Sequence, residues 1–363
     1  MYTAFLERTQ RGIDSLRRHL ATSEALRAAI HEGTLTCKGE SPCFHQPLFS
    51  IEAAPDRLEW RVIDHCAAVT RIYAIYEQFA QEMIREHLSL LQTHIAFTGL
   101  PECLKTSYRK GLAEILHKKD GPRYGHLDLA DLITQYDRAL SGKPYQLEPV
   151  AMLMQEQNLR LPELKRLFAA CGIENVDAWI EKHRSVIAFF LKDGRLTASA
   201  EHEIKELIEY RNDAAHGSIN IDELPGLDYL FEFCDFVSAI CEALSERVQL
   251  TGLECLINAG RALRRGKVSE CIKSDLVLIS KVTGSFKVGD TIYLCGDGYC
   301  MARYIVGLQV DDIDHSEVSL VEPTELGFAI DKPGRKKAGI ITINSSSSMV
   351  VPANDDAATA TAD

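Results

Sequence analysis

Arg211, Asn212 and His216 lie close together near the end of a segment whose composition predicts a helix. At about 100° per residue, Asn212 and His216 are one turn apart on the same face, and the long side chain of Arg211 reaches that face from about 140° around the helix. Gly217 follows, and glycine most readily takes the left-handed conformation just after a helix. We therefore predict that three polar groups converge in a last helical turn.

These residue types could cleave RNA without a metal ion. A histidine side chain can act as a base or as an acid near neutral pH, and the negative end of a helix favours its cationic form. RNA carries its own nucleophile, the 2′-hydroxyl, so a catalyst must remove that proton, protonate the leaving 5′-oxygen and stabilise charge on phosphorus. Arg211 suits the last task because a guanidinium donates two parallel hydrogen bonds to phosphate. Ala214 and Ala215 add little bulk, so a second chain or a nucleic acid could approach closely.

The same residues also fit a structural role. A histidine in a last helical turn can hydrogen-bond the unpaired carbonyl groups there, and Arg211 can join a surface ion-pair cluster with Glu209 and Asp213. Taken alone, the short motif favours this structural interpretation, because arginine and histidine at such a spacing are common by chance. The surrounding sequence favours the catalytic interpretation instead.

Three segments carry a family resemblance over roughly the first 250 residues. Residues 58–79 read LEWRVIDHCAAVTRIYAIYEQF, a middle segment opens with Asn158-Leu159-Arg160, and residues 211–216 read RNDAAH. The middle segment continues through Leu164, Leu167, Phe168, Gly172 and Ile173. In order and spacing, these segments resemble the HEPN ribonucleases, specifically the RiboL-PSP-HEPN group.

The resemblance implies an α-helical, metal-independent endoribonuclease that acts as a homodimer, with two copies of the motif facing each other across the interface. Such enzymes often belong to toxin or antiviral defence systems. The resemblance carries over Arg211 and His216 as the catalytic pair and Asn212 as the polar residue after the arginine, with no metal and no cofactor. Some HEPN toxins have a tyrosine two residues after the histidine, where this chain has Ser218, so a function tied to that tyrosine is not carried over.

The charge of the chain limits how it could bind RNA. With 363 residues, 46% of them hydrophobic, the chain is long enough for two domains, and its formal net charge of -12 argues against a protein that coats nucleic acid broadly. A nuclease needs only a local positive patch. The candidates are Arg261, Arg264, Arg265 and Lys267, and a second group at residues 335–337, and each also fits a solvated helix end or loop, the interpretation that the sequence favours.

The cysteines indicate a reducing compartment. Eleven cysteines are scattered without a regular framework, and neither a secretory signal nor a membrane-spanning stretch is evident, so we expect a cytoplasmic protein. Cys37, Cys43 and His45 could bind zinc, but their spacing differs from a zinc knuckle and no clear fourth ligand follows.

Apolar residues at helical spacing predict an extended all-α region. Tyr73, Tyr76, Phe79 and Met83 follow three- and four-residue steps and are expected in the core, whereas Glu77 either pairs with Arg211 or faces solvent. The predicted helices cover residues 3–31, 60–92, 104–116, 127–140, 161–171, 176–191, 198–210 and 228–250, with an irregular loop at residues 33–55.

After about residue 266 the hydrophobic pattern changes to period two, which predicts a small antiparallel β-barrel. The predicted strands cover residues 276–279, 291–294, 304–306, 318–321 and 339–343. Asp297-Gly298 predicts a hairpin turn that places Cys295 and Cys300 on neighbouring strands. Residues 281–343, with FKVGD at 286–290 and LGFAI at 326–330, resemble the second domain of translational GTPases, although no GTP-binding domain is present.

These observations predict an α+β multidomain protein with a helical domain at residues 1–250, a linker or helix end at 251–267, a β-barrel at 268–345 and a disordered tail at 346–363. The predicted function is cytoplasmic cleavage of RNA by a homodimer, with the barrel recognising an RNA or protein activator or serving only as a supporting appendage. The alternative is a catalytically silent HEPN scaffold that binds RNA or a protein partner. A nucleotide-transfer enzyme has little support, because no glycine-rich phosphate loop or suitably spaced pair of metal-binding carboxylates is found.

Overall fold

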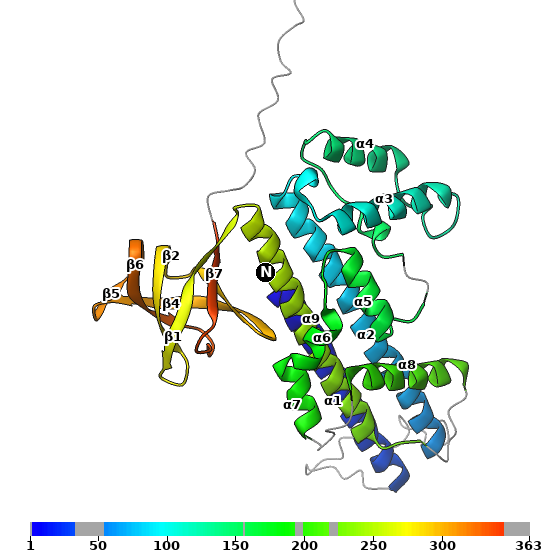
Figure 1. The fold of residues 1–363 in the computed structure, drawn as a ribbon. Helices are drawn as coiled ribbons and strands as arrows, with labels where there is room; N and C mark the ends of the chain where they lie inside the picture. The colour runs from blue at the N-terminus through cyan, green and yellow to red at the C-terminus, as the bar shows by residue number, and fades with distance from the viewer. Residues whose placement is uncertain (1, 33–53, 155–156, 193–198, 218–223, 345–363) are drawn as a thin grey trace, which may run out of the picture. The chain divides into compact units, whose positions relative to one another are not determined.

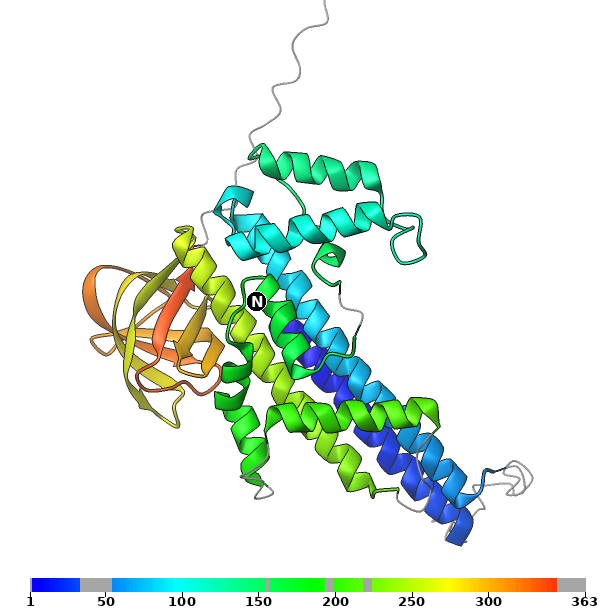
Figure 2. The same ribbon diagram turned by 45° about the vertical axis from the view of Figure 1, so that its right-hand side comes forward.

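The computed structural model describes residues 2–32, 54–154, 157–192, 199–217 and 224–344. A helical region is followed in the chain by an antiparallel β-barrel, as Figures 1 and 2 show, so the predicted α+β class is confirmed. The α-helices are α1 (Thr3–Glu32), α2 (Arg57–His94), α3 (Glu102–His117), α4 (Leu129–Leu140), α5 (Leu161–Ala170), α6 (Val176–Lys182), α7 (Arg184–Lys192), α8 (Ala200–His216) and α9 (Leu227–Asn258), with short 3-10 helices η3 (Phe97–Gly99) and η4 (Pro149–Ala151). None of the helices in these described ranges is long and apolar enough to cross a membrane.

One predicted helix is in fact two. Residues 176–191 were expected to form a single helix, but His183 has an extended backbone, with φ -70° and ψ 135°, and separates α6 from α7. Its ring Nδ1 accepts a hydrogen bond of 3.3 Å from the backbone N–H of Ser185, one of the amides that the start of α7 would otherwise leave unpaired. The hydrophobic pattern continues through the break, which is why the sequence did not reveal it.

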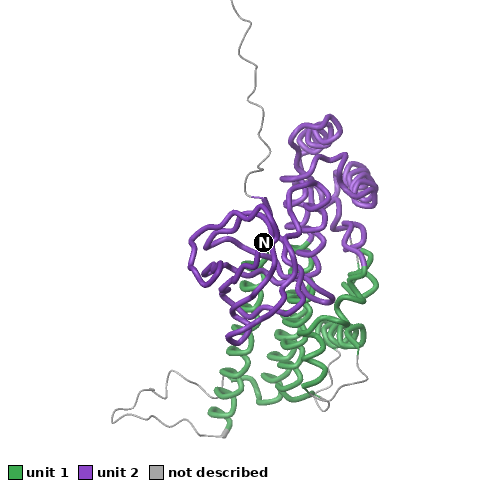
Figure 3. The backbone as a smooth tube through the Cα atoms, turned by 60° about the vertical axis from the view of Figure 1, so that its left-hand side comes forward, with its two compact units in different colours: residues 1–83, 155–166, 175–245 green, residues 84–154, 167–174, 246–363 purple. Residues whose placement is uncertain are grey.

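Contacts between Cα atoms divide the chain into two compact units, coloured in Figure 3. The first unit comprises Met1–Met83, Gln155–Arg166 and Asn175–Ser245, and the second comprises Ile84–Met154, Leu167–Glu174 and Glu246–Asp363. Arg211, Asn212 and His216 all belong to the first unit, and the barrel belongs to the second. The domain limits expected from the sequence stay a prediction.

The core of the first unit contains the aromatic stripe of α2. Tyr73, Tyr76, Phe79 and Met83 are all buried, as their spacing predicts. Near the start of α2, a buried ion pair joins it to α1: Arg27 NH1 lies 2.7 Å from Asp64 Oδ2. Ser23 donates a further hydrogen bond of 2.6 Å to the same carboxylate oxygen, so the buried charge of Asp64 is well compensated.

The barrel of the second unit is closed. Strand order is β3-β7-β1-β2-β6-β4-β5, and an additional β3–β4 pairing joins the ends of the six-stranded ring. The strands are β1 (Ala262–Ile272), β2 (Val277–Lys287), β3 (Thr291–Gly296), β4 (Tyr299–Val310), β5 (Ile313–His315), β6 (Glu317–Ile330) and β7 (Gly339–Ile343). The interior is filled by apolar side chains that include Phe286, Phe328 and Ile340. Closure leaves the six strands of the ring paired on both sides.

Two details of the barrel compare directly with expectation. The predicted hairpin is confirmed, because Cys295 pairs with Cys300 across the turn and Gly298 has a φ of 74°. The thiols are free and buried, with their Sγ atoms 3.1 Å apart. In contrast, β1 has no counterpart among the predicted strands. The expected loop at residues 33–55 and the expected tail fall almost entirely outside the described residues, as do Cys37, Cys43 and His45.

Each unit contains a fully buried histidine with a lowered pKa. In the first unit, burial lowers the pKa of His65 to about 4, and the positive charges of Arg61 and Arg27 act in the same direction. In the second unit, burial lowers the pKa of His87 to about 4. Both imidazoles are therefore neutral in the folded protein at neutral pH.

These histidines should make the fold less stable in mild acid. The unfolded chain binds more protons than the folded chain below the ordinary histidine pKa of about 6.5, so the stabilising effect is complete above that pH and is lost as the pH falls toward 4. For each histidine, we expect the free energy of unfolding to be about 2 kcal/mol lower near pH 5 than near pH 7.5. Denaturant titrations at the two pH values should show a weaker pH dependence for His65→Gln than for wild type. An unchanged dependence, equal to that of a variant at the exposed His202, His202→Gln, would contradict this assignment.

Candidate active site at the end of helix α8

The sequence around α8 defines both of its ends. At the start, the Ser199 hydroxyl accepts a hydrogen bond of 3.3 Å from the His202 backbone N–H. At the end, Gly217 is left-handed, with φ 69° and ψ 22°, and its N–H donates to the Asp213 carbonyl. The prediction that His216 occupies the last turn is therefore confirmed.

Arg211 is held by three side chains of the first unit. Its NH1 donates hydrogen bonds of 2.9 Å to Asn212 Oδ1 and 3.2 Å to Asn158 Oδ1. The Asn158 amide nitrogen also donates to Asn212 Oδ1 at 3.4 Å, so each of the two amides and the guanidinium is hydrogen-bonded to the other two groups. The guanidinium carbon lies 4.7 Å from the centre of the Tyr73 ring, within the range of a cation–π contact. Arg211 is thus fixed in position while staying partly exposed.

Asn158 is positioned by the neighbouring peptide groups. The backbone N–H of Leu159 donates to the Tyr73 hydroxyl at 2.9 Å, and the Tyr76 hydroxyl donates to the Leu159 carbonyl at 2.9 Å. Leu159 itself is completely buried. Burial raises the pKa of Tyr73, and the negative charge of Glu77 also raises it, so the hydroxyl stays protonated. Two tyrosines of α2 therefore fix the segment that supplies Asn158 to α8.

Tyr210 provides a second attachment for the end of α8. Its hydroxyl lies 2.8 Å from His65 Nδ1 on α2, and its ring packs against Tyr229 and Phe233 of α9. Because the folded pKa of His65 is about 4, its ring is neutral and its unprotonated nitrogen can accept from the tyrosine hydroxyl. Figure 2 shows α8 lying across these helices. The residue that precedes Arg211 is thus anchored from two sides.

His216 is placed differently from Arg211. Its side chain is exposed, and within the described ranges it makes no hydrogen bond with Arg211 or Asn212. The exposed side of α8 also bears Lys205 and Glu209, and Glu209 forms loose ion pairs with Lys205 at 3.9 Å and Arg160 at 3.8 Å. Of the three predicted site residues, the structure brings Arg211 and Asn212 together, whereas His216 is exposed and makes no hydrogen bond with either of them in the described residues.

Sequence reasoning did not identify the residues that hold Arg211. Asn158 belongs to a segment that carries the family resemblance, but no role was assigned to it. Tyr73 was correctly expected in the core, although its spacing says nothing about its hydroxyl. The possible pairing of Glu77 with Arg211 is not seen among the described residues, where Glu77 is half-buried and acts on Tyr73.

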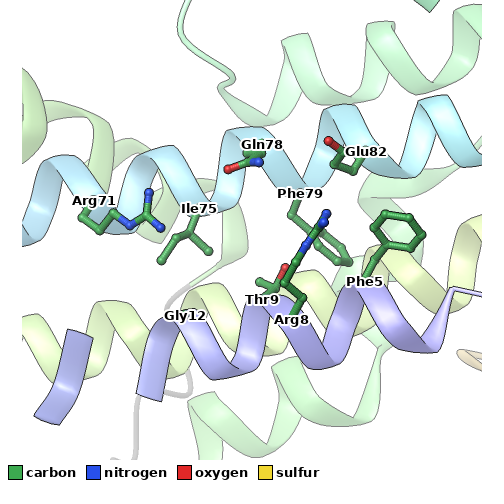
Figure 4. A pocket seen from close by; sticks show the side chains of 9 residues that line it. All are labelled: Phe5, Arg8, Thr9, Gly12, Arg71, Ile75, Gln78, Phe79 and Glu82. Carbon is green, nitrogen blue, oxygen red and sulfur yellow. The ribbon is translucent and has the colours of Figure 1, made fainter. Parts of the chain in front are cut away.

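A separate pocket lies between α1 and α2 in the same unit, as Figure 4 shows. It has a volume of about 210 Å³, with apolar side chains of Phe5, Ile75 and Phe79 and charged side chains of Arg71 and Glu82 among its lining residues. None of the predicted site residues lines it. It is therefore distinct from the site at the end of α8.

Comparison with known families decides how this geometry is interpreted. A family model described as RiboL-PSP-HEPN matches residues 48–249, more than half of the chain and all of the elements that position Arg211 and His216. The chain is a member of the RiboL-PSP-HEPN family. HEPN domains are associated with RNA binding and ribonuclease activity, and they often form dimers.

Other comparisons add little to this HEPN assignment. No curated protein matches the chain. Among solved structures, the C-terminal domain of a Geobacillus thermoleovorans protein described as a U32 peptidase matches with 12% sequence identity and a TM-score of 0.20. The match covers 22% of this chain and 91% of that domain. At this TM-score the likeness carries no argument about the HEPN protein.

The hydrogen bonds between Leu159 and the tyrosines of α2 predict an effect on the free energy of unfolding. Tyr76→Phe removes a buried hydroxyl and leaves the Leu159 carbonyl without its donor, so we expect the free energy of unfolding to fall by about 1–3 kcal/mol. Tyr304→Phe is the matched control because Tyr304 is 51% exposed. Urea denaturation of both variants tests this, and equal stabilities would show that the Tyr76 hydroxyl does not hold the segment.

Proposed function

We propose that this HEPN protein is a metal-independent endoribonuclease that acts as a homodimer. The observation that carries the proposal is the fixed position of Arg211 within a family associated with ribonuclease activity. In the described part of the chain, only NH1 of the guanidinium donates hydrogen bonds, which leaves Nε and NH2 for the oxygens of a phosphate. Asn212 orients Arg211, and His216 supplies proton transfer.

The proposed step is an in-line displacement at phosphorus. An imidazole of His216 takes the proton of the RNA 2′-hydroxyl while that oxygen forms a bond to phosphorus. The bond from phosphorus to the 5′-oxygen breaks, and a second imidazole, in its cationic form, donates a proton to that leaving oxygen. Arg211 stabilises the charge on the phosphorus oxygens. The products are a 2′,3′-cyclic phosphate and a 5′-hydroxyl, and no metal or cofactor takes part.

The homodimer is supported by the exposure of His216 and by the number of proton-transfer groups that the step needs. Arg211 is held against α2 of its own chain, whereas His216 is exposed and makes no hydrogen bond with Arg211 in the described residues. One copy supplies only one His216, while the step needs both a base and an acid. A second copy that packs its α8 against the first would supply the other imidazole, and the small Ala214 and Ala215 would allow a close approach.

Cleavage assays test the catalytic assignment directly. We expect wild-type protein to cut RNA in the presence of a chelator, with rates lowered about 10²–10⁴-fold by His216→Ala and about 10²–10³-fold by Arg211→Ala. His202→Ala, which changes an exposed histidine on the same helix, should retain wild-type activity. End-group analysis should find 2′,3′-cyclic phosphates. Products with 3′-hydroxyl and 5′-phosphate ends, or loss of activity in the chelator, would refute the mechanism.

Mixed dimers test whether both copies are needed. When wild-type and His216→Ala chains are co-refolded in equal amounts, random pairing makes about one quarter of the dimers fully wild type. We expect the mixture to retain about one quarter of the activity of the same total amount of wild-type protein. Retention of about one half would mean that each copy acts alone.

The second candidate is a catalytically silent HEPN scaffold that binds RNA or a protein partner. It is favoured by one observation: the contacts of Arg211 with Asn158 and Tyr73 also tie α8 to the rest of its unit. RNA binding without cleavage, under conditions in which the variants stay folded, would support this candidate. The cytoplasmic location, the toxin or antiviral role and an activator bound by the barrel stay predictions.

A further inference from the structure

The surface of the barrel contains a groove of about 480 Å³ with four cations around it. Arg264, Arg265 and Lys267 come from β1, and Lys281 comes from β2. All four side chains are exposed or partly exposed, in a chain whose formal net charge is -12. The first three belong to the basic cluster that the sequence offers as a candidate positive patch for RNA, with a solvated helix end or loop as the alternative.

The arrangement of the lysines is electrostatically unfavourable in the protein alone. Lys267 and Lys281 are direct partners in the antiparallel β1–β2 ladder, so two positive side chains lie opposite each other. Like charges in such a pair destabilise a sheet. Glu325 is paired with Lys281 on the other side, in β6, yet within the described ranges none of the four cations forms an ion pair. The residues that line the groove therefore include four cations and no carboxylate, and Glu325 lies beside them on β6.

Arg265 is held in place before any ligand arrives. Its Nε donates a hydrogen bond of 2.8 Å to the hydroxyl of Thr342 on β7. The guanidinium lies against Gly284, where an added Cβ would be 2.1 Å from NH1 and would displace the guanidinium from this position. Burial also lowers the pKa of Arg265 from its ordinary value, although an arginine this basic stays charged. A fixed cation loses little side-chain entropy on binding an anion.

The backbone around the groove departs from a regular ladder. Register shifts between Arg264 and Gly266 and between Val282 and Gly284 interrupt the sheet at this point. An added Cβ at Gly266 would lie 2.4 Å from the carbonyl oxygen of Lys281, so the two strands approach closely here. Bulges of this kind redirect side chains and are frequent next to functional sites.

Apolar residues, Val282, Pro323, Ile340 and Ile341, also line the groove, and its charged side chains point to phosphate groups as the ligand. No aromatic side chain lines it, so it offers no surface on which a nucleobase could stack. Closely spaced lysines and arginines match the repeating negative charge of a phosphodiester backbone, which such cations bind without sequence preference. We propose that this groove binds the phosphodiester backbone of an RNA strand and thereby delivers RNA to the same polypeptide that cuts it. The proposal rests on the proposed function for the choice of RNA.

A binding experiment with the full chain tests the groove. All proteins carry His216→Ala so that the RNA stays intact, and the probe is a fluorescently labelled 12-nucleotide oligouridylate. The test variant is Lys267→Gln with Lys281→Gln. The matched control is Lys273→Gln with Lys287→Gln, which removes the same charge from exposed positions of the β1–β2 hairpin outside the groove.

We expect the test variant to bind the probe about tenfold or more weakly, and the slope of log affinity against log salt to become about 1.4 units shallower for two lost phosphate contacts. The control should bind as the parent protein does. The test variant should melt at about the same temperature as the parent, because the loss of the Lys267–Lys281 repulsion is offset by the loss of the attraction between Lys281 and Glu325. Equal binding by parent and test variant would overturn the proposal, as would an equal loss in the control.

Competitors identify the source of the anion. Failure of millimolar uridine monophosphate to displace the probe assigns the groove to an RNA strand, whereas full displacement assigns it to a free nucleotide. An oligoglutamate that displaces the probe as effectively as unlabelled RNA would overturn the RNA assignment. Cleavage by the chain with its native His216 is measured in parallel. Cleavage without RNA binding at the groove overturns only the groove proposal, whereas RNA binding at the groove without cleavage overturns only the proposed function.

Discussion

The candidate site depends on one buried peptide. The N–H and the carbonyl of Leu159 are both bound by tyrosine hydroxyls of α2, and this double contact fixes the preceding Asn158 beside α8. Without it, the link between two segments more than 50 residues apart in sequence would rest on the hydrogen bonds of one partly exposed amide and a loose ion pair between Arg160 and Glu209. A buried backbone group must find a partner, so the tyrosines serve the fold and the site through the same hydrogen bonds.

Arg211 and His216, at the two ends of the motif at residues 211–216, differ in how many contacts hold them. Arg211 is held by an amide, an aromatic ring and its neighbour Asn212, whereas His216 is placed on an exposed surface by the left-handed Gly217. A group that binds a phosphate gains from being fixed, because less freedom is lost on binding. A group that transfers protons between changing partners must reach both of them.

The sequence predicted what depends on local patterns and missed what depends on distant partners. The spacing of Tyr73 and Tyr76 predicted their burial, and Gly217 predicted the end of α8. The hydroxyl partners could not be predicted, because Leu159 lies more than 80 residues away and its neighbours give no local signal. The break at His183 was missed because its ring accepts a hydrogen bond from the Ser185 amide at the start of α7, which the hydrophobic pattern does not show. Strand β1 was missed because the bulge at Gly266 interrupts its alternation.

The cation–π contact of Arg211 has a consequence for how an anion would bind. In the part of the chain that the structure describes, the guanidinium is supported by a ring and two amides rather than by a carboxylate. A carboxylate would hold the side chain equally well, but an incoming phosphate would then have to compete with a resident counter-ion. Neutral supports restrain the arginine without forming an ion pair to it. A phosphate that binds here therefore does not have to break an ion pair of Arg211 with a described residue.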